Sequence, residues 1–583
     1  MRTALRSVPA INGLPGPHLL REALDFLEIL DASGRVVLER LPFSANDTTA
    51  GTETELQVAV AGEKNAVDLP LTIESSNYYS NVVRRTATGD LPRGSVGALE
   101  RILNGNSENI WENSWVRFDR SVLCEYAART FEGDLRADKS SPSGERRTDV
   151  SRFLFTGPDG REMVRVPVSY LVKLSMAQFI GRGRDLPFLL RSTGMRLMDH
   201  YLNDNTSPET FSFHVVPLIP SSGMGLAAAR ETSKRMLLTQ LLVMYANRDF
   251  GLRESGQNAV IYFSPHPPLR QKSLNELISD SFYRDLFMSP CLSGWDRGEE
   301  KYRYMRLCHK VLSRSQLNAV AKLKHAGIIV NNLVVLPSTS NVSLANNGTH
   351  VSLGSRRLTG AMAAAGSGFR HVHEKYAGDL VIKITEHFLP LFVGTYSAAP
   401  YRLGYADFHP EKALGFLAHE LDYTQLRILW RKWKGKAKIR IFGTPVTPFG
   451  PVWLDRLLSG IFRLSGDFVN DFRLLDYLVS LLGTDRSPAL DGTPGNGDRL
   501  KDDLAELGVF DAGMSLYHLV KLREFSRMGF SGFEARHYSL FESMRYDMGN
   551  AVTLQNLIHA CAFRMIAEGK VSHRDIPDTP HGE

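Results

Sequence analysis

Short β-like segments alternate with long helical segments through the middle of the chain. Residues 211–219, 259–263 and 328–336 are apolar, and they have the length and residue types of strands. Residues 226–245 and 299–325, which lie between them, have the length and pattern of long helices. This order predicts a mixed α+β fold with some βα units.

The two ends of the chain differ from this middle part. Residues 26–30 and 36–41 flank a turn sequence, which predicts an N-terminal hairpin. From about residue 405 onward, helical patterns dominate. We therefore expect a curved, mostly antiparallel sheet with flanking helices and a helical C-terminal region. The predicted division is a β-rich part at 1–136, a central α+β part at 149–404 and a helical part at 405–583.

Composition excludes several classes of protein. Of the 583 residues, 43% are hydrophobic and 23% are charged, which is typical of a chain that folds around a core and not of a disordered one. The net charge of +6 is small for this length and does not favour nucleic acid as a partner. We find neither a run of about 18 apolar residues nor a signal-peptide pattern, so we expect no membrane partner. The four cysteines are scattered along the sequence without a pairing or metal-binding spacing, so we interpret them as reduced thiols. Reduced thiols predict a cytoplasmic location.

An acidic pair lies in a segment that alternates like a strand. Alternation over residues 53–61 puts Glu53 and Glu55 on one face, about 7 Å apart. Carboxylates this close repel each other unless a cation lies between them, and oxygen ligands favour Mg²⁺ or Mn²⁺. Glu74 is a candidate third carboxylate. The alternative interpretation is a strand face whose glutamates point into water.

A second candidate segment, residues 346–357, combines glycines with one histidine and two arginines. Glycine would let a ligand approach the backbone closely. His350 is a candidate ligand of a metal or a phosphate, and Arg356 and Arg357 are candidates for neutralising phosphate charge. The alternative is a hairpin with a hydrogen-bonded histidine.

A third segment begins at Glu386 as an apolar helix and ends in the turn Ser397-Ala398-Ala399-Pro400, which Arg402 follows closely. A tight turn after a buried helix can present backbone groups to a ligand. We include Arg402 with Arg356 as candidate catalytic cations. Simple helix termination is the alternative.

In this order, the three segments resemble the glutamate–cysteine ligase and carboxylate–amine ligase superfamily, which shares its catalytic fold with glutamine synthetase. The resemblance implies that Glu53 and Glu55 hold Mg²⁺, with Glu74 as a looser candidate for the next acidic ligand. His350 matches the histidine of the family's Gly-x-His-Val strand, whereas Ser352 stands where many members have a second histidine.

The chemistry implied by this resemblance uses ATP and Mg²⁺. ATP would phosphorylate a small-molecule carboxylate, and an amine would attack the acyl phosphate. Such a reaction needs no nucleophilic side chain, which agrees with the absence of a Gly-x-Ser-x-Gly motif. A homo-oligomer is compatible with this interpretation.

A turn between a predicted strand and a predicted helix is a further candidate for binding the nucleotide. Residues 220–226 contain Ser222, Gly223 and Gly225 ahead of the helix, and amides at a helix N-terminus favour an anion. The segment lacks the lysine of a P-loop and the third glycine of a dinucleotide fingerprint. An ordinary βα turn is the alternative.

Two patterns favour other functions. Residues 371–422 gather histidines and carboxylates that would suit Zn²⁺ or Fe²⁺, as in a metal-dependent hydrolase or oxygenase. The histidines of this cluster are His371, His373, His387, His409 and His419, and the acidic residues are Glu374, Glu386, Glu411, Glu420 and Asp422.

Residues 427–440 form a basic segment with two tryptophans, which is compatible with a non-catalytic protein that binds RNA or a partner. The alternative interpretation is a solvated helix face, because Lys and Arg stems commonly lie along such a surface.

Overall fold

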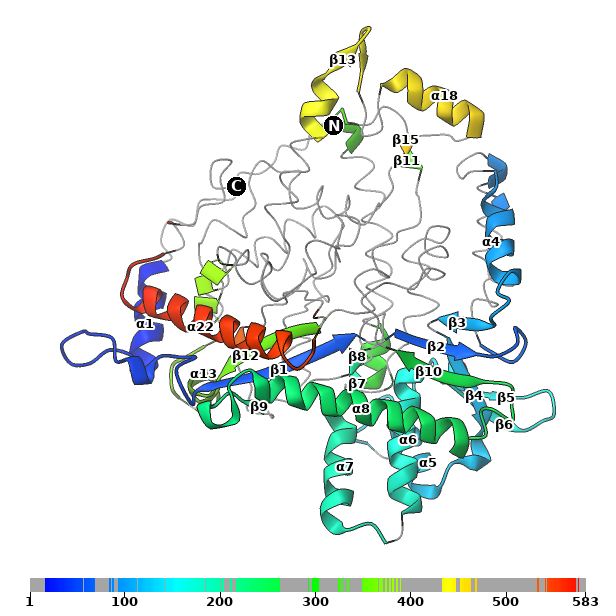
Figure 1. Cartoon of the computed structure of the whole chain (residues 1–583), viewed down its shortest axis with the longest axis horizontal. Coiled ribbons are helices and arrows are strands. Elements are labelled where there is room, and N and C mark those ends of the chain that lie inside the picture. Colours follow the sequence, from blue (N-terminus) through cyan, green and yellow to red (C-terminus); the bar gives the residue numbers. More distant parts are fainter. Residues whose placement is uncertain are drawn as a thin grey trace.

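Among the residues that the computed structural model describes, the largest sheet has six strands, which come from distant parts of the sequence (Figure 1). Their order is β16-β12-β1-β8-β7, with β9 also paired to β1, and every pairing is antiparallel. All three predicted regions of the chain therefore contribute to one sheet. The strands are β1 (Thr48–Glu55), β7 (Leu202–Asn203), β8 (Thr210–Phe211), β9 (Val216–Pro217), β12 (Thr349–Ser355) and β16 (Gly532–Phe533).

The structure describes part of the chain. The described residues are 16–55, 57–68, 83–84, 86–88, 93–112, 114–141, 143–183, 185–200, 202–203, 210–211, 216–262, 292, 296–303, 323–325, 327–328, 333–334, 349–364, 366–370, 373–374, 377–378, 380–381, 384–385, 388, 433–446, 451–462, 467–468, 532–533, 541, 543–572 and 575.

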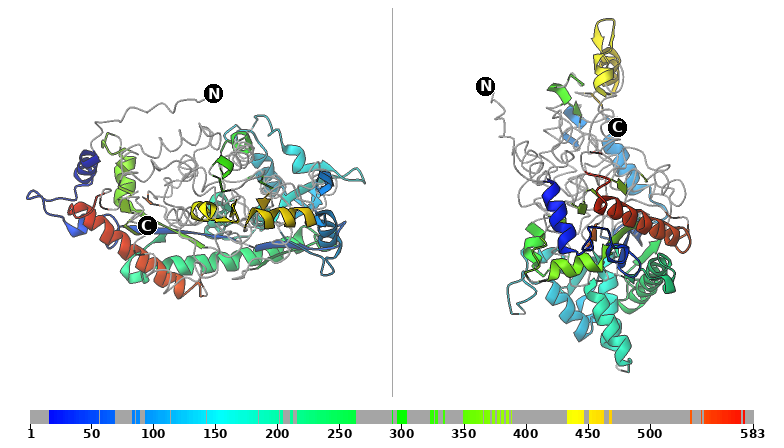
Figure 2. Two further views of the ribbon diagram at one scale, coloured as in Figure 1. Left: turned by 90° about the horizontal axis from the view of Figure 1, so that it is seen from above. Right: turned by 90° about the vertical axis from the view of Figure 1, so that its left-hand side faces the viewer.

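Two long helices, α8 (Leu226–Asp249) and α22 (Asp547–Ala567), pack along one face of β1 (Figures 1 and 2). Two buried threonines of β1 attach the strand to these helices. The Thr48 hydroxyl donates to Asn556 Oδ1 at 2.7 Å, and the hydroxyls of Thr52 and Thr232 share a 2.5 Å hydrogen bond. The apolar residues around this interface form one of the two hydrophobic cores. They include Ala50, Leu218, Ala229, Val351, Leu353, Met548, Val552 and Phe563.

The strand predicted over residues 53–61 is confirmed, but the structure divides it between two sheets. Its second part is β2 (Gln57–Ala61), which pairs with β10 (Asn258–Tyr262) and β3 (Ile110–Glu112) in a separate antiparallel sheet. The acidic strand β1 therefore runs directly into the second hydrophobic core, where Val58 and Val60 are buried.

This second core lies between a third antiparallel sheet and two helices. The sheet contains β4 (Trp115–Asp119), β6 (Glu162–Pro167) and β5 (Leu154–Thr156), and β5 and β6 form an antiparallel hairpin. Helices α5 (Glu125–Asp134) and α6 (Val168–Arg182) pack against each other beside it. Phe118 stacks on Phe250 in this core, with their ring centroids 4.7 Å apart.

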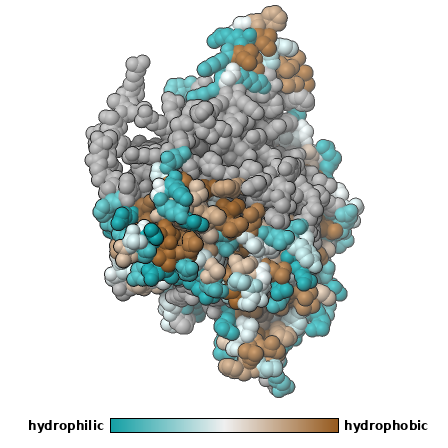
Figure 3. Space-filling model, turned by 60° about the vertical axis from the view of Figure 1, so that its left-hand side comes forward, coloured by the Kyte–Doolittle hydropathy of each residue, from teal (hydrophilic) through white to brown (hydrophobic). Residues whose placement is uncertain are grey.

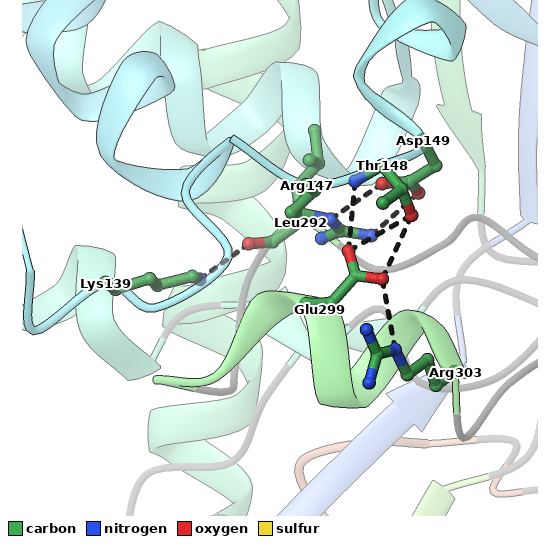
Figure 4. A network of polar contacts seen from close by, with 7 residues as sticks. All are labelled: Lys139, Arg147, Thr148, Asp149, Leu292, Glu299 and Arg303. Atoms are coloured by element: carbon green, nitrogen blue, oxygen red, sulfur yellow. Dashed lines mark hydrogen bonds and ion pairs between the residues drawn. The ribbon is translucent and has the colours of Figure 1, made fainter. Parts of the chain in front are cut away.

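A network of polar contacts joins the loop over 137–149 to the segment 292–303 (Figure 4). The Lys139 ammonium donates to the carbonyl of Leu292 at 2.6 Å, and the backbone N–H of Thr148 donates to Glu299 at 2.9 Å. Arg303 donates to the same glutamate at 3.2 Å. These contacts hold the loop against residues that are distant in the sequence.

The predicted N-terminal hairpin is confirmed only in its short central part, around the turn at residues 31–34. Residues 30 and 36 form a single antiparallel bridge, and Asp31 accepts hydrogen bonds from the backbone N–H groups of Ser33 and Arg35. The chain before it is helix α1 (Gly16–Phe26), because an apolar helix face buries Ala23 and Leu24. Residues 38–40 form the short helix η1 (Leu38–Arg40).

The other described elements complete an α+β fold of helices and small, mostly antiparallel sheets; one parallel pair, β11 with β15, is also present. None of the helices in the described ranges combines the length and apolar character needed to cross a bilayer. The elements are α4 (Ser95–Asn104), η2 (Arg120–Val122), η3 (Val150–Arg152), α7 (Phe188–His200), η4 (Pro220–Ser222), β11 (Leu333–Val334), α13 (Arg356–Ala363), β13 (Arg440–Ile441), β14 (Thr444–Pro445), α18 (Val452–Phe462) and β15 (Asp467–Phe468).

Candidate functional site

The pairing of β1 with β12 sets two of the predicted site positions opposite each other. The ladder runs from Thr48 opposite Ser355 to Thr54 opposite Thr349, and within it Glu53 is the partner of His350. Directly opposed residues in an antiparallel pair have Cβ atoms about 4.5–5.5 Å apart. The acidic pair and the glycine-flanked histidine, which are far apart in the sequence, therefore meet at one end of the ladder.

Alternation along the two strands separates their positions into two faces. Ala50, Val351 and Leu353 belong to the face that packs into the core. Gly51 with its partner Ser352 belongs to the other face, together with Glu53 and His350. Glu55 falls on this same face by alternation, opposite Thr210 of β8.

The face that carries Glu53 and His350 is built from small and polar residue types near its end. Position 51 is a buried glycine, and its partner at position 352 is a serine, so both are small residue types. The two glutamates at these positions offer carboxylate oxygens, which suit Mg²⁺ or Mn²⁺, and the histidine offers an imidazole nitrogen, which more often binds Zn²⁺, Fe²⁺ or Cu²⁺. This end of the β1–β12 ladder is the candidate site.

Arg356 and Arg357 lie beyond the opposite end of β12. Six residues of nearly extended chain separate Arg356 from His350, which corresponds to about 20 Å. The backbone N–H groups of both arginines donate to Asp47, and the guanidinium of Arg357 donates to the carbonyl of Leu27 at 3.4 Å. The structure thus does not bring these arginines to the Glu53–His350 end, and they start helix α13 instead.

The turn with Ser222, Gly223 and Gly225 also lies at that far end, because the preceding strand β9 pairs with Thr49 and Ala50. Its backbone groups are used within the protein. The N–H of Gly223 donates to Pro220 O, and the N–H of Gly225 donates to the hydroxyl of Thr553 on α22 at 3.2 Å. The turn therefore joins α8 to α22, as the alternative interpretation of an ordinary βα turn expects.

Other predicted residues lie outside the described residues. These are Glu74 and Arg402, together with His371, His387, His409, His419, Glu386, Glu411, Glu420 and Asp422 of the proposed His/carboxylate cluster. Their roles stay predictions.

His373 is the described histidine of that cluster, and it is buried between aromatic rings. Its Nδ1 accepts the backbone N–H of Arg370 at 2.9 Å, and its Nε2 lies 3.1 Å from Glu22 on α1. Phe26 and Phe369 pack against the imidazole with centroids 5.4 and 5.7 Å away. Both ring nitrogens are thus engaged in structural contacts. In the described ranges, no three or more His, Cys, Asp or Glu side chains lie together in a way that could hold a metal ion, so the candidate site rests on the backbone register of Glu53 and His350.

Asp47 is a positioning residue that the sequence patterns did not single out. Its carboxylate accepts hydrogen bonds from the Phe43 backbone, from the Ser355 hydroxyl at 2.6 Å and from the backbone of Arg357 at 2.9 Å. Asp47 therefore joins the start of β1 to the end of β12 and fixes the register of the ladder. The sequence signal that could have indicated the role of Asp47 is Ser355, a residue type typical of a helix N-cap. In the structure, the Ser355 hydroxyl accepts the backbone N–H of Leu358.

Comparison with protein-family models, with curated proteins and with solved structures gives no match for this chain.

Proposed function

We propose that the protein is an ATP- and Mg²⁺-dependent ligase that joins a carboxylate to an amine. The observation that carries the proposal is the backbone register that pairs Glu53 with His350. The resemblance of these two segments to carboxylate–amine ligases requires their residues to share one site. The register is compatible with that requirement at the level of the backbone.

In this proposal, Glu53, Glu55 and His350 hold the Mg²⁺ ions that accompany ATP. Bound Mg²⁺ would neutralise charge on the transferring phosphoryl group. The carboxylate substrate takes the γ-phosphoryl group and ADP leaves. The amine then attacks the acyl carbon, an amide forms and inorganic phosphate is released. The small residue types at positions 51 and 352 would let the phosphates and the carboxylate approach the strands closely.

The structure narrows the set of cations proposed to act on the phosphates. Arg356 and Arg357 are placed at the far end of β12, so we omit them from the proposed site. Arg402 remains the proposed catalytic cation. Glu74 remains the proposed third carboxylate. The curved form of the sheet, known from the family, also remains part of the proposal.

The test is calorimetric titration of Mg²⁺–ATP into the wild-type protein and the Glu53→Gln/Glu55→Gln double variant. Glutamine preserves size but removes both negative charges, so we expect nucleotide binding to weaken by about 100-fold or more, since even outer-shell changes at metal sites cost about 10- to 100-fold. The matched control is Glu39→Gln, an exposed glutamate on η1, which should bind Mg²⁺–ATP like the wild type. Unchanged binding by the double variant would refute the proposed site.

A further inference from the structure

The hairpin of β13 and β14 and the helix α18 form an apolar tip at one end of the molecule (top of Figures 1 and 3). Phe442, at the turn of the hairpin, is 98% exposed. Three apolar side chains spaced four residues apart on α18 are 52–62% exposed. We call these residues the tip surface: Ile439, Ile441, Phe442, Trp453, Leu457 and Ile461.

The spacing on α18 puts the three exposed apolar residues on one side of the helix. Leaving large apolar side chains in water is unfavourable, by about 1.5–3 kcal/mol for each one that could be fully buried. Groups of exposed apolar side chains on protein surfaces therefore mark sites of interaction. The tip surface has the character of such a site.

Positive charge surrounds this apolar surface. Lys438 and Arg440 are exposed beside Phe442, and Arg456 is exposed on α18. Figure 3 shows hydrophilic residues next to the apolar ones at this end of the molecule. The surface is therefore complementary to a partner with an apolar interior and negative charge at its boundary.

The backbone makes the tip convex. Phe442 and Gly443 have φ angles of +49° and +79°, which close a tight turn with the phenylalanine at its outermost point. A convex apolar tip needs a partner that yields around it or that already has a matching cavity. A second copy of the same surface offers neither, and its positive charges would repel those of the first.

We propose that the tip surface binds the surface of an anionic phospholipid bilayer, with Phe442 and Trp453 entering the headgroup region and Lys438, Arg440 and Arg456 facing the lipid phosphates. Amphipathic surfaces with Trp and Phe on one side and Lys or Arg on the other bind membranes in this peripheral manner. The interaction is independent of the ligase activity proposed above.

Another apolar surface of the molecule serves as a comparison. Phe188, Leu189 and Leu190, at the start of α7, are 84, 70 and 59% exposed. Near them, Arg182 forms a 2.7 Å ion pair with Asp249. This second surface also has exposed arginines near it, Arg182 and Arg196, but Arg182 is paired with Asp249, so we expect it to attract anionic lipid less than the tip does.

The test is flotation of the full-length protein with vesicles of phosphatidylcholine alone or of equimolar phosphatidylcholine and phosphatidylserine. We expect binding to the anionic vesicles and much weaker binding to the neutral ones. Phe442→Ser with Trp453→Ser should weaken anionic-vesicle binding about tenfold or more. Lys438→Glu with Arg440→Glu should weaken it at least about tenfold and abolish the preference for phosphatidylserine.

The control is Phe188→Ser with Leu189→Ser, which removes two large exposed apolar side chains from the comparison surface and should leave vesicle binding unchanged. All of these side chains are exposed, and circular dichroism verifies that each variant is folded. Equal binding to both kinds of vesicle, no binding to either, or loss of binding in the control variant would each overturn the proposal. Saturable binding of a synthetic acidic, leucine-rich peptide at the tip without vesicle binding would assign the surface to a protein partner instead.

Discussion

Asp134→Asn is expected to lower the free energy of unfolding by about 3–5 kcal/mol, because it leaves buried ammonium groups without their counter-charge. Asp134 is the last residue of α5 and is 5% exposed. Its carboxylate accepts hydrogen bonds from Lys139 at 2.7 Å, from Lys173 at 2.6 Å and from the Tyr170 hydroxyl at 2.6 Å. The variant keeps the shape of the side chain but leaves two lysines close together in a buried site.

The same cluster predicts a dependence of stability on pH. Burial by itself would raise the pKa of the Asp134 carboxyl, but the ammonium groups of Lys139 and Lys173 outweigh burial and hold the pKa far below its ordinary value. In the unfolded chain this carboxyl titrates near its ordinary pKa of about 3.9. Its stabilising contribution is therefore complete above about pH 4 and is lost as the pH falls from there toward the folded-state pKa.

Urea denaturation of the wild type and Asp134→Asn from neutral pH down to about pH 3 measures both effects. The wild type should lose stability below about pH 4 more steeply than the variant does. Asp138→Asn is the matched control, because this aspartate lies in the adjoining loop, where its carboxylate accepts the backbone N–H and the hydroxyl of Ser140. The Asp138→Asn variant should lower the free energy of unfolding much less than Asp134→Asn does. A loss below about 1 kcal/mol for Asp134→Asn, within the range of ordinary surface substitutions, would contradict this account of the cluster.

Gly225→Ala should separate α8 from α22 and destabilise the protein by about 3 kcal/mol or more, at the upper end of overpacking effects. A Cβ atom at residue 225 would lie 2.2 Å from the carbonyl oxygen of Gly549 and 2.7 Å from the backbone nitrogen of Thr553. Both are backbone atoms of α22, so they cannot turn away as a side chain would. The φ angle of Gly225 is −58°, which alanine tolerates, so the effect is purely one of space.

Gly360→Ala is the control for this prediction. Residue 360 lies within α13, and a Cβ atom there meets nothing within 4 Å. Alanine is the better helix former, so this variant should be more stable than the wild type by about 0.5–1 kcal/mol. Thermal denaturation of the wild type, Gly225→Ala and Gly360→Ala measures these differences in stability. Equal stability of Gly225→Ala and the wild type would show that the two helices do not approach as closely as described.

The pattern of the sequence predicted local elements well where apolar residues repeat regularly. The helix predicted over 226–245 is α8, because its apolar positions recur at helical spacing. The hairpin predicted over 26–41 is confirmed only around its turn, because the chain on either side of the bridge between residues 30 and 36 forms helix α1 and the short 3₁₀ helix η1.

The candidate site could be predicted from the sequence only in part. Alternation placed Glu53 and Glu55 on one strand face, but no local pattern specifies which distant strand lies beside it. That choice depends on the Asp47 contacts at the other end of the ladder and on the packing of Thr48 and Thr52 against α22 and α8. The sequence also gave no indication that Arg356 and the Gly223 turn would lie at the far end.

The central claim is that Glu53 and His350 hold one divalent ion together with ATP. Pulsed electron paramagnetic resonance of Mn²⁺–ATP bound to the protein tests it most directly, because a coordinated imidazole produces a ¹⁴N coupling to the manganese. We predict this coupling in the wild type and in Glu39→Gln. His350→Gln should remove it, and Glu53→Gln should weaken Mn²⁺–ATP binding. Bound Mn²⁺–ATP with the same spectrum in the wild type and in His350→Gln would contradict the account.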